Sequence, residues 1–335
     1  MPTRMLRLFR SSRGAAFLRL AVSGLLLAWL LRQVAWTALW AQMRHVDAAW
    51  LGLALLSTVA AFVFTTWRWR AVLQALGLDA PPTHLLAVVL ITFFWNHFLP
   101  TTVGGDGYRF LWLRGRFPGR DKAAAAGIFL DRLVGYWALM LVHVALLGGL
   151  ALTGQPLPPP MLLAVDAAVL AAALAVPVVW FGPWPWARWA VRFPLPQGWR
   201  QKVAQGLAGL TARPRVLTGR TLAYAVLFVL AQSGLQFAYL RALGARPPLP
   251  AVLYAATLGA LLGVLPVSLN GLGVFEGVMV GVLEPLGWPR EQILAAAFLA
   301  RGVNLLLALL GGLLYALAPP GRQTPAPDPH GKGAA

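Results

Sequence analysis

Eight long apolar stretches alternate with short polar, Arg-rich or Pro-rich segments along this 335-residue chain. They cover roughly residues 15–31, 49–67, 84–99, 123–152, 160–181, 221–240, 249–266 and 291–317. A helix needs about 20 predominantly apolar residues to cross a bilayer. The pattern therefore predicts an all-α polytopic membrane protein.

Two of the eight stretches are interrupted in the same way. Each apolar run stops at Leu-Pro and continues as a glycine-rich bend, in Leu99-Pro100-Thr101-Thr102-Val103-Gly104-Gly105-Asp106 and in Leu265-Pro266-Val267-Ser268-Leu269-Asn270-Gly271-Leu272-Gly273. Proline ends or kinks a helix, and glycine allows the dihedral angles of a tight bend. We therefore expect two re-entrant broken-helix hairpins, at 84–112 and 249–288, which leaves six full transmembrane helices.

The two breaks indicate an internal repeat. Pro100 and Pro266 are 166 residues apart, and the same shift moves 123–152 onto the last apolar stretch. Residues 15–152 then form a first transmembrane repeat and residues 153–318 a second. Because each half holds three full spans, the second half runs upside down relative to the first. Inverted repeats with paired broken helices are typical of secondary transporters.

The distribution of basic residues supports this topology. With six spans and two hairpins, the cytoplasmic loops carry 20 Lys and Arg and the outer loops carry 5. If all eight stretches crossed fully, 15 would lie outside and 10 inside, which inverts the positive-inside rule. The six-span arrangement predicts a multi-pass membrane protein with both termini in the cytoplasm.

Three further segments complete the expected organisation. Residues 1–14 hold four arginines before the first span, which is typical of an uncleaved signal anchor. Residues 182–220 are rich in Pro, Trp and Arg, and predict a cytoplasmic interfacial segment against anionic lipid; simple positive-inside anchoring explains them equally well. The Pro- and Gly-rich residues 319–335 predict a disordered cytoplasmic tail.

The composition excludes several classes of protein. Hydrophobic residues make up 59% of the chain and charged residues 11%, with a mean hydropathy of +0.69, whereas soluble domains are about 25% charged. There is no cysteine, which excludes disulfides, iron–sulfur clusters and thiolate zinc sites. The net charge of +18 follows the loops of a membrane protein, so we expect neither a nucleic-acid partner, a metal nor a cofactor.

Polar residues inside the membrane are the candidate functional residues, because a charge there is costly. They gather at the two hairpins and in the spans that follow them. The set consists of Asn96, Thr101, Thr102, Gly104, Gly105, Asp106, Arg109, Asp131, Arg132, Ser268, Asn270, Gly271, Gly273, Glu276, Arg301 and Asn304.

Several of these residues have an expected role and a structural alternative. Free backbone N–H groups after the first break, together with Arg109, predict an anion site; alternatively, the glycines form a turn and Asp106 caps a helix. Asp131 is expected to pair with Arg301, for function or as a lock between the halves. Glu276 is expected to line one cavity with Asp106 and Arg109, in a proton-coupling role or as a helix cap.

One basic and aromatic cluster is expected to anchor the chain in the membrane. Trp67, Arg68, Trp69 and Arg70 follow one another at the end of the second span. Such clusters are common at membrane interfaces. The interpretation assigns them no part in a binding site.

The motifs resemble those of the lysylphosphatidylglycerol synthase transmembrane-domain family, also called flippase-like. The resemblance lies in Asn96 to Asp106 with Arg109, in Asp131-Arg132-Leu133-Val134-Gly135, and in Leu265-Pro266-Val267-Ser268 with Gly271 to Glu276. It implies a domain that handles or translocates lipids. The sequence stops soon after the last predicted span, so we expect no soluble aminoacyl-transfer domain and no lysyl transfer.

The favoured hypothesis is a lipid flippase or transporter, not an enzyme. It would move an anionic or glycosylated lipid, of the phospholipid, polyprenyl-phosphate or hopanoid type, across the inner membrane. Two other classes stay open: an integral-membrane transferase or hydrolase of lipid phosphates, with Asp106 or Glu276 as base, and a non-catalytic membrane partner of a glycosyltransferase or other lipid-synthesis enzyme.

Overall fold

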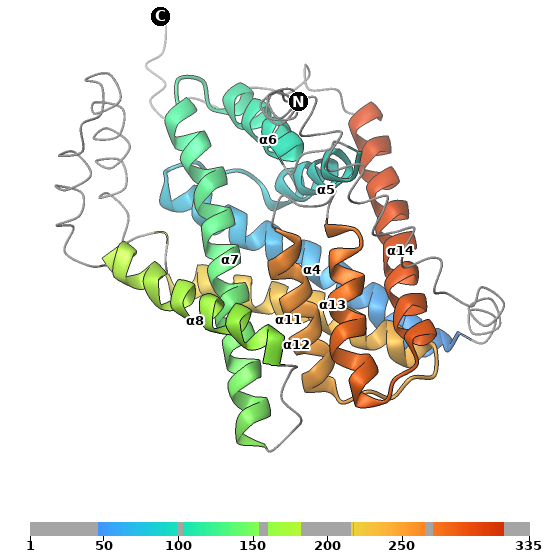
Figure 1. The fold of residues 1–335 in the computed structure, drawn as a ribbon. Coiled ribbons are helices and arrows are strands. Elements are labelled where there is room, and N and C mark those ends of the chain that lie inside the picture. Colours follow the sequence, from blue (N-terminus) through green and yellow to red (C-terminus); the bar gives the residue numbers. More distant parts are fainter. Residues whose placement is uncertain are drawn as a thin grey trace, which may run out of the picture.

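The computed structural model describes residues 46–98, 103–153, 160–181, 216, 218–264 and 271–317, and every regular element within them is helical (Figure 1). The first half contains α4 (Ala48–Ala75), α5 (Pro82–Phe98), α6 (Val103–Arg116) and α7 (Asp121–Leu152), and is followed by α8 (Pro160–Phe181). The second half contains α11 (Gly219–Ala242), α12 (Leu249–Gly263), α13 (Val274–Leu283), the short 3-10 helix η2 (Glu284–Leu286) and α14 (Arg290–Leu317).

Among the described residues, four helices are long and apolar enough to cross a membrane. They are α4, α7, α11 and α14, and they coincide with four of the six predicted spans. The fifth, at 160–181, forms the apolar helix α8, and the sixth, at 15–31, lies outside the described residues. Exposed leucines cover one side of α14, at 305, 306, 309, 310 and 313. An exposed apolar helix face of this kind suits contact with lipid, so the chain is a multi-pass membrane protein.

Helices of similar length recur in the two halves of the chain. Corresponding helix ends in the two halves are separated by between 165 residues, from Phe98 to Gly263, and 171 residues, from Val103 to Val274. Each half contains a long helix, a helical hairpin (α5–α6 or α12–α13) and a second long helix. In Figure 1, α7 and α14 run in opposite directions, as an inverted repeat requires. The complete arrangement of six spans and two re-entrant hairpins stays a prediction.

The first long helix of each half ends in the same way. Gly77 has φ of 71° and Gly244 has φ of 80°, a left-handed conformation that favours glycine. The N–H of each glycine bonds to a carbonyl three residues earlier, and the next N–H bonds to a carbonyl five residues earlier, Leu78 to Leu73 and Ala245 to Leu240. This pattern is the Schellman motif, and it turns the chain towards the hairpin in both halves.

The two halves pack closely against each other. Helix α4 packs along α11, the first arm of each hairpin packs against the last long helix of the other half (α5 on α14 and α12 on α7), and α7 also contacts α11. A Cβ atom at Gly311 of α14 would lie 2.2 Å from the carbonyl oxygen of Leu90 in α5. The backbones of these two helices therefore approach more closely than any side chain would allow. This packing brings polar residues from both halves to one central region.

Candidate functional site

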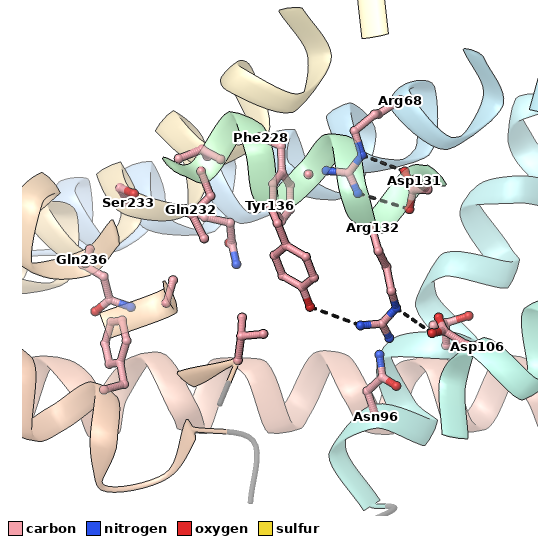
Figure 2. A pocket seen from close by; sticks show the side chains of 18 of the residues that line it. Arg68, Asn96, Asp106, Asp131, Arg132, Tyr136, Phe228, Gln232, Ser233 and Gln236 are labelled. Carbon is pink, nitrogen blue, oxygen red and sulfur yellow. Dashed lines mark hydrogen bonds and ion pairs between the residues drawn. The ribbon is translucent and has the colours of Figure 1, made fainter. Parts of the chain in front are cut away.

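A cavity of about 410 Å³ lies between the two halves of the protein. Figure 2 shows the two pairs Arg68–Asp131 and Arg132–Asp106 toward one end, and Gln232, Ser233 and Gln236 toward the other. The first half contributes α4, α5, α6 and α7, and the second half contributes α11 and the hairpin. Its polar lining consists of Arg68, Thr92, Asn96, Asp106, Arg109, Asp131, Arg132, Tyr136, Gln232, Ser233 and Gln236.

Two buried arginines share one carboxylate at this cavity. Arg68 donates from Nε to Asp131 Oδ1 at 2.7 Å and from Nη2 to Oδ2 at 3.2 Å. Arg109 donates from Nη1 to the same Oδ2 at 3.1 Å. The three side chains are only 8%, 9% and 1% exposed for Arg68, Arg109 and Asp131. Three helices, α4, α6 and α7, therefore meet at a cluster with two positive charges and one negative charge.

The surroundings of this cluster fix the positions of both guanidinium groups. Arg109 lies over the ring of Trp69 at 4.6 Å, and Arg68 lies over the ring of Phe228 at 5.4 Å. Both contacts are within the range of cation–π attraction. A Cβ atom at Gly135 would lie 3.0 Å from Nη1 of Arg68, so the glycine one turn after Asp131 makes room for this arginine.

A second ion pair lies at the more exposed end of the cavity. Arg132 donates from Nε to Asp106 Oδ2 at 2.5 Å and from Nη1 to the hydroxyl of Tyr136 at 3.2 Å, as Figure 2 shows. The side chain of Arg132 is 29% exposed and that of Asp106 is 18% exposed. This pair joins the first turn of α6 to α7, and its charges balance.

The lining of the cavity as a whole carries an excess of positive charge. Three guanidinium groups (Arg68, Arg109 and Arg132) face two carboxylates (Asp106 and Asp131), and the unbalanced charge belongs to the buried cluster around Asp131. A charge in surroundings of low dielectric constant interacts strongly with a partner of opposite sign. The cavity is therefore arranged to attract an anion.

Four buried polar atoms at the cavity make no hydrogen bond to any of the residues that the structure describes. One is a donor, Arg109 Nε; two are acceptors, Asp106 Oδ1 and Gln236 Oε1; and the fourth is the hydroxyl of Thr92. Buried polar groups are normally satisfied, by protein, water or ligand. A molecule that offers both acceptors and hydrogen-bond donors would satisfy all four.

A smaller cavity of about 200 Å³ adjoins the first, and Arg109 is the one charged residue among those that line it. The two share the side chains of Thr92, Asn96, Arg109, Phe228 and Gln232. The smaller cavity adds the polar residues Thr58, Thr65 and Asn304. Arg109 thus borders a charged space on one side and a space lined by hydroxyls and amides on the other.

The second hairpin contains an ion pair that corresponds to Asp106–Arg132. Glu276, in the first turn of α13, accepts a hydrogen bond from Nε of Arg301 in α14 and another from the N–H of Gly273 at 2.8 Å. Arg132 and Arg301 each lie eleven residues after the first residue of their helix, Asp121 or Arg290. In each half, therefore, the hairpin is tied to the following long helix by an acid–arginine pair.

The family profile for the lysylphosphatidylglycerol synthase TM region matches residues 16–312. The match covers most of the chain, including both hairpins and every residue of the cavity. The chain belongs to this family. No curated protein matches it.

Membership of the lysylphosphatidylglycerol synthase TM family agrees with the resemblance expected from the motifs. It makes the chain a membrane protein of a lipid-related family. The cavity between the halves contains Asp106, Arg109, Asp131 and Arg132 from the first two motifs. The third motif supplies Glu276, which lies outside both cavities.

Three expectations about the charged residues were wrong. Asp131 pairs with Arg68 and Arg109 instead of Arg301, and Arg301 pairs with Glu276. Glu276 is fully buried and does not line the cavity with Asp106 and Arg109; instead it binds the N–H before its own helix, which was the capping alternative. Arg68, expected to anchor the chain at the membrane interface with Trp69, is buried with it and lies at the centre of the site.

The remaining predicted residues fall into three groups. Asn96 lines both cavities and accepts a hydrogen bond from the N–H of Gly105 at 3.1 Å, while Gly104 belongs to the same turn of α6. Asn304 lines the smaller cavity, and Gly271 and Gly273 form the turn before α13 with positive φ. Thr101, Thr102, Ser268 and Asn270 lie outside the described residues.

Sequence reasoning missed the contribution of α11 to the site. Gln232, Ser233 and Gln236 line the cavity from the second half, and Tyr136 from α7 binds Arg132. A signal was available, because Gln232 and Gln236 are one helical turn apart within an apolar span, and residues at this spacing share a helix face.

Proposed function

We propose that this protein moves an anionic lipid between the two leaflets of the membrane, with the lipid headgroup in the cavity and the acyl chains in the surrounding bilayer. The observation that carries the proposal is the sharing of Asp131 by two buried arginines beside a cavity. A buried cluster with an excess positive charge is stabilised by an anion, and arginine is well suited to a phosphate.

The size and chemistry of the cavity support a headgroup as the ligand. Its volume of about 410 Å³ falls within the range of about 300–1,000 Å³ for small-molecule sites. A phosphodiester offers acceptors to Nε of Arg109 and carries one negative charge, which matches the excess in the lining. Headgroup hydroxyls would donate to Asp106 Oδ1 and Gln236 Oε1, the two cavity acceptors that have no hydrogen-bond partner in the described part of the chain.

The repeat supports movement of the lipid as well as its binding. The cavity is lined by helices of both halves, and in inverted-repeat transporters one half or bundle rocks against the other around such a site. We also propose a carrier and not an enzyme. Each carboxylate at the cavity is hydrogen-bonded to an arginine. These carboxylates therefore balance the charge of the arginines, whereas a catalytic base would need a free carboxylate.

Reconstitution into proteoliposomes tests this proposal. Fluorescent phosphatidylglycerol and phosphatidylcholine, which differ in net charge, are followed between leaflets by chemical quenching of the outer leaflet. The wild-type protein should accelerate movement of the anionic lipid and have little effect on the zwitterionic one. Arg109→Gln should reduce the anionic rate by about tenfold or more, which corresponds to about 1.4 kcal/mol of lost interaction.

Arg114→Gln is the matched control. Arg114 lies on the same helix as Arg109, but its side chain is 62% exposed and it does not line either cavity. Its rate should equal that of the wild type. Equal rates for both lipids, or a wild-type rate in a folded Arg109→Gln protein, would overturn the proposal; a change in lipid mass during the assay would favour an enzyme.

A further inference from the structure

A second cluster of buried polar residues lies outside both cavities. His143 of α7, Asp166 of α8, and Tyr254 and Thr257 of α12 meet in the second half's hairpin region, and each is at most 2% exposed. Asp166 is the only charged residue in α8. A charged residue in an apolar membrane helix is costly unless it is partnered, and usually has a function.

The four side chains form a continuous hydrogen-bonded network. His143 contacts Asp166 Oδ1 through Nε2 at 2.9 Å and the hydroxyl of Thr257 through Nδ1 at 2.9 Å. The hydroxyl of Tyr254 lies 3.0 Å from each oxygen of Asp166, and the ring of Tyr254 stacks on His143 with centroids 4.9 Å apart. Both nitrogens of the imidazole are therefore engaged.

The hydroxyl of Thr257 can either accept a hydrogen bond from Nδ1 of His143 or donate one to it. It has one hydrogen and lies 2.9 Å from three groups: Nδ1 of His143 and the carbonyl oxygens of Leu253 and Tyr254. If the hydrogen points to a carbonyl, Thr257 accepts from a protonated Nδ1. If it points to Nδ1, that nitrogen must be unprotonated, since a neutral imidazole has one donor and one acceptor.

The two arrangements differ by one proton, and neither leaves a group unpaired. With Nδ1 protonated, the positive imidazolium is paired with Asp166 and donates to Thr257. With Nδ1 unprotonated, Nε2 and the hydroxyl of Tyr254 still donate to Asp166, and Thr257 rotates to donate to the ring. The network can therefore take up and release a proton inside an apolar region, where an isolated charge would be strongly disfavoured.

The charged groups of the headgroup cavity do not take part in this network. Asp166 on α8 and Tyr254 on α12 are the titratable groups that face His143 among the described residues. On α7, the charged side chains of α4 and α6 contact Asp131 and Arg132, which lie twelve and eleven residues before His143, or about 17 Å along the helix. The arginines of α11, Arg220 and Arg241, lie over Tyr224 and Trp50.

We propose that His143, Asp166 and Thr257 form a proton-binding site that couples lipid movement to the proton gradient. The coupling rests on the proposed lipid transport. Helix α12 connects the two sites, because it supplies Tyr254 and Thr257 to the network and Ala256 and Ala260 to the wall of the headgroup cavity. Binding of a proton changes the hydrogen bonds between α12 and α7, and the position of α12 shapes the cavity.

The proton site is tested first without transport. A protein in which His45, His84, His97 and His330 are replaced by Gln keeps His143 as its only histidine. Nitrogen NMR of this ¹⁵N-histidine-labelled protein in nanodiscs should show the ring changing protonation between about pH 5 and 8. Asp166→Asn should shift that transition. A ring that keeps one protonation state across this range would overturn the proton site.

Coupling is tested in proteoliposomes with a pH gradient. For one proton per lipid, the steady-state ratio of labelled phosphatidylglycerol between the leaflets should change by about tenfold per pH unit. His143→Gln and Thr257→Val should abolish this dependence while lipid still equilibrates at equal pH, whereas Thr257→Ser, which keeps the hydroxyl, should retain it.

The possible failures are distinguishable. Lipid movement that ignores the gradient in the wild type would overturn the coupling alone, as would an unchanged gradient response in folded His143→Gln. Absence of lipid movement under all conditions would overturn the proposed transport and, with it, the coupling. In that case the NMR titration would still decide whether His143 binds a proton. A purely structural network would lower thermal stability in the variants and leave the gradient response intact.

Discussion

Arg132 and Arg301 occupy equivalent positions in the two halves, and each binds an acidic residue in the first turn of the preceding hairpin helix. The partners differ in length and burial: Asp106 borders the headgroup cavity, whereas Glu276 is fully buried and also binds the backbone N–H of Gly273. The equivalent ion pair thus borders the ligand site in the first half, whereas in the second half it stabilises the packing of two helices.

This difference predicts unequal costs for removing the two acids. Glu276→Gln removes a fully buried carboxylate that binds both Arg301 and the N–H of Gly273, and should destabilise the protein by about 2 kcal/mol. Asp106→Asn should cost about 1 kcal/mol or less, because water can reach the partly exposed pair with Arg132. Thermal unfolding in nanodiscs measures both. The double variant Glu276→Gln with Arg301→Gln should recover part of the loss, and equal costs for the two single variants would contradict the interpretation.

The buried cluster predicts opposite behaviour for Asp131 and Arg109. Asp131→Asn leaves two buried arginines without a carboxylate and should cost about 3–5 kcal/mol. Arg109→Gln leaves Arg68 and Asp131 as a balanced pair, so its cost should be limited to about 1 kcal/mol from the lost contact with Trp69. Chemical or thermal unfolding at equal lipid composition compares them. If Arg109→Gln lowered the free energy of unfolding more than Asp131→Asn does, Arg109 would be needed for stability. The excess positive charge would then not be explained by ligand binding.

Two glycines of α14 provide a matched test of the packing between the halves. A Cβ atom at Gly311 would meet the backbone of Leu90, so Gly311→Ala must separate α14 from α5 and should cost about 2 kcal/mol or more. Gly302 has nothing within 4 Å, and Gly302→Ala should stabilise the helix by up to about 1 kcal/mol. The melting temperatures of the two variants should move in opposite directions, and a harmless Gly311→Ala would show that the helices are farther apart.

The predicted inverted topology specifies which side of the membrane each hairpin region should face. A cysteine at Gly115, which is exposed at the end of α6, should be labelled by an impermeant maleimide only from the cytoplasm, as should one at Gly209, outside the described residues. A cysteine at the exposed Pro289, before α14, should be labelled only from outside. The chain has no natural cysteine, so each variant gives one signal. Labelling of Gly115→Cys and Pro289→Cys from the same side would contradict the inverted arrangement.

Local sequence patterns determined the helices and the spacing at which they recur. Apolar stretches of membrane length predicted α4, α7, α11 and α14, because a chain segment in lipid must satisfy its backbone hydrogen bonds internally. The Leu-Pro breaks lie between the helices of both hairpins, since proline and glycine act on their own backbone. These effects depend on residues close together in the chain, and the sequence displays them directly.

Tertiary structure decided which charges pair and where the site lies. The sequence indicated that Asp131 and Arg132 need partners, but Asp131 met Arg68, 63 residues away, in place of Arg301. Arg68 resembled an interfacial anchor because its neighbours are tryptophans, but its bonds to Asp131 and its approach to Gly135 show that it points inward. The network of His143, Asp166 and Thr257 likewise joins three helices. Partners of this kind are chosen by the rotation and crossing of whole helices, which depend on packing over the entire interface and not on the residues beside each charge.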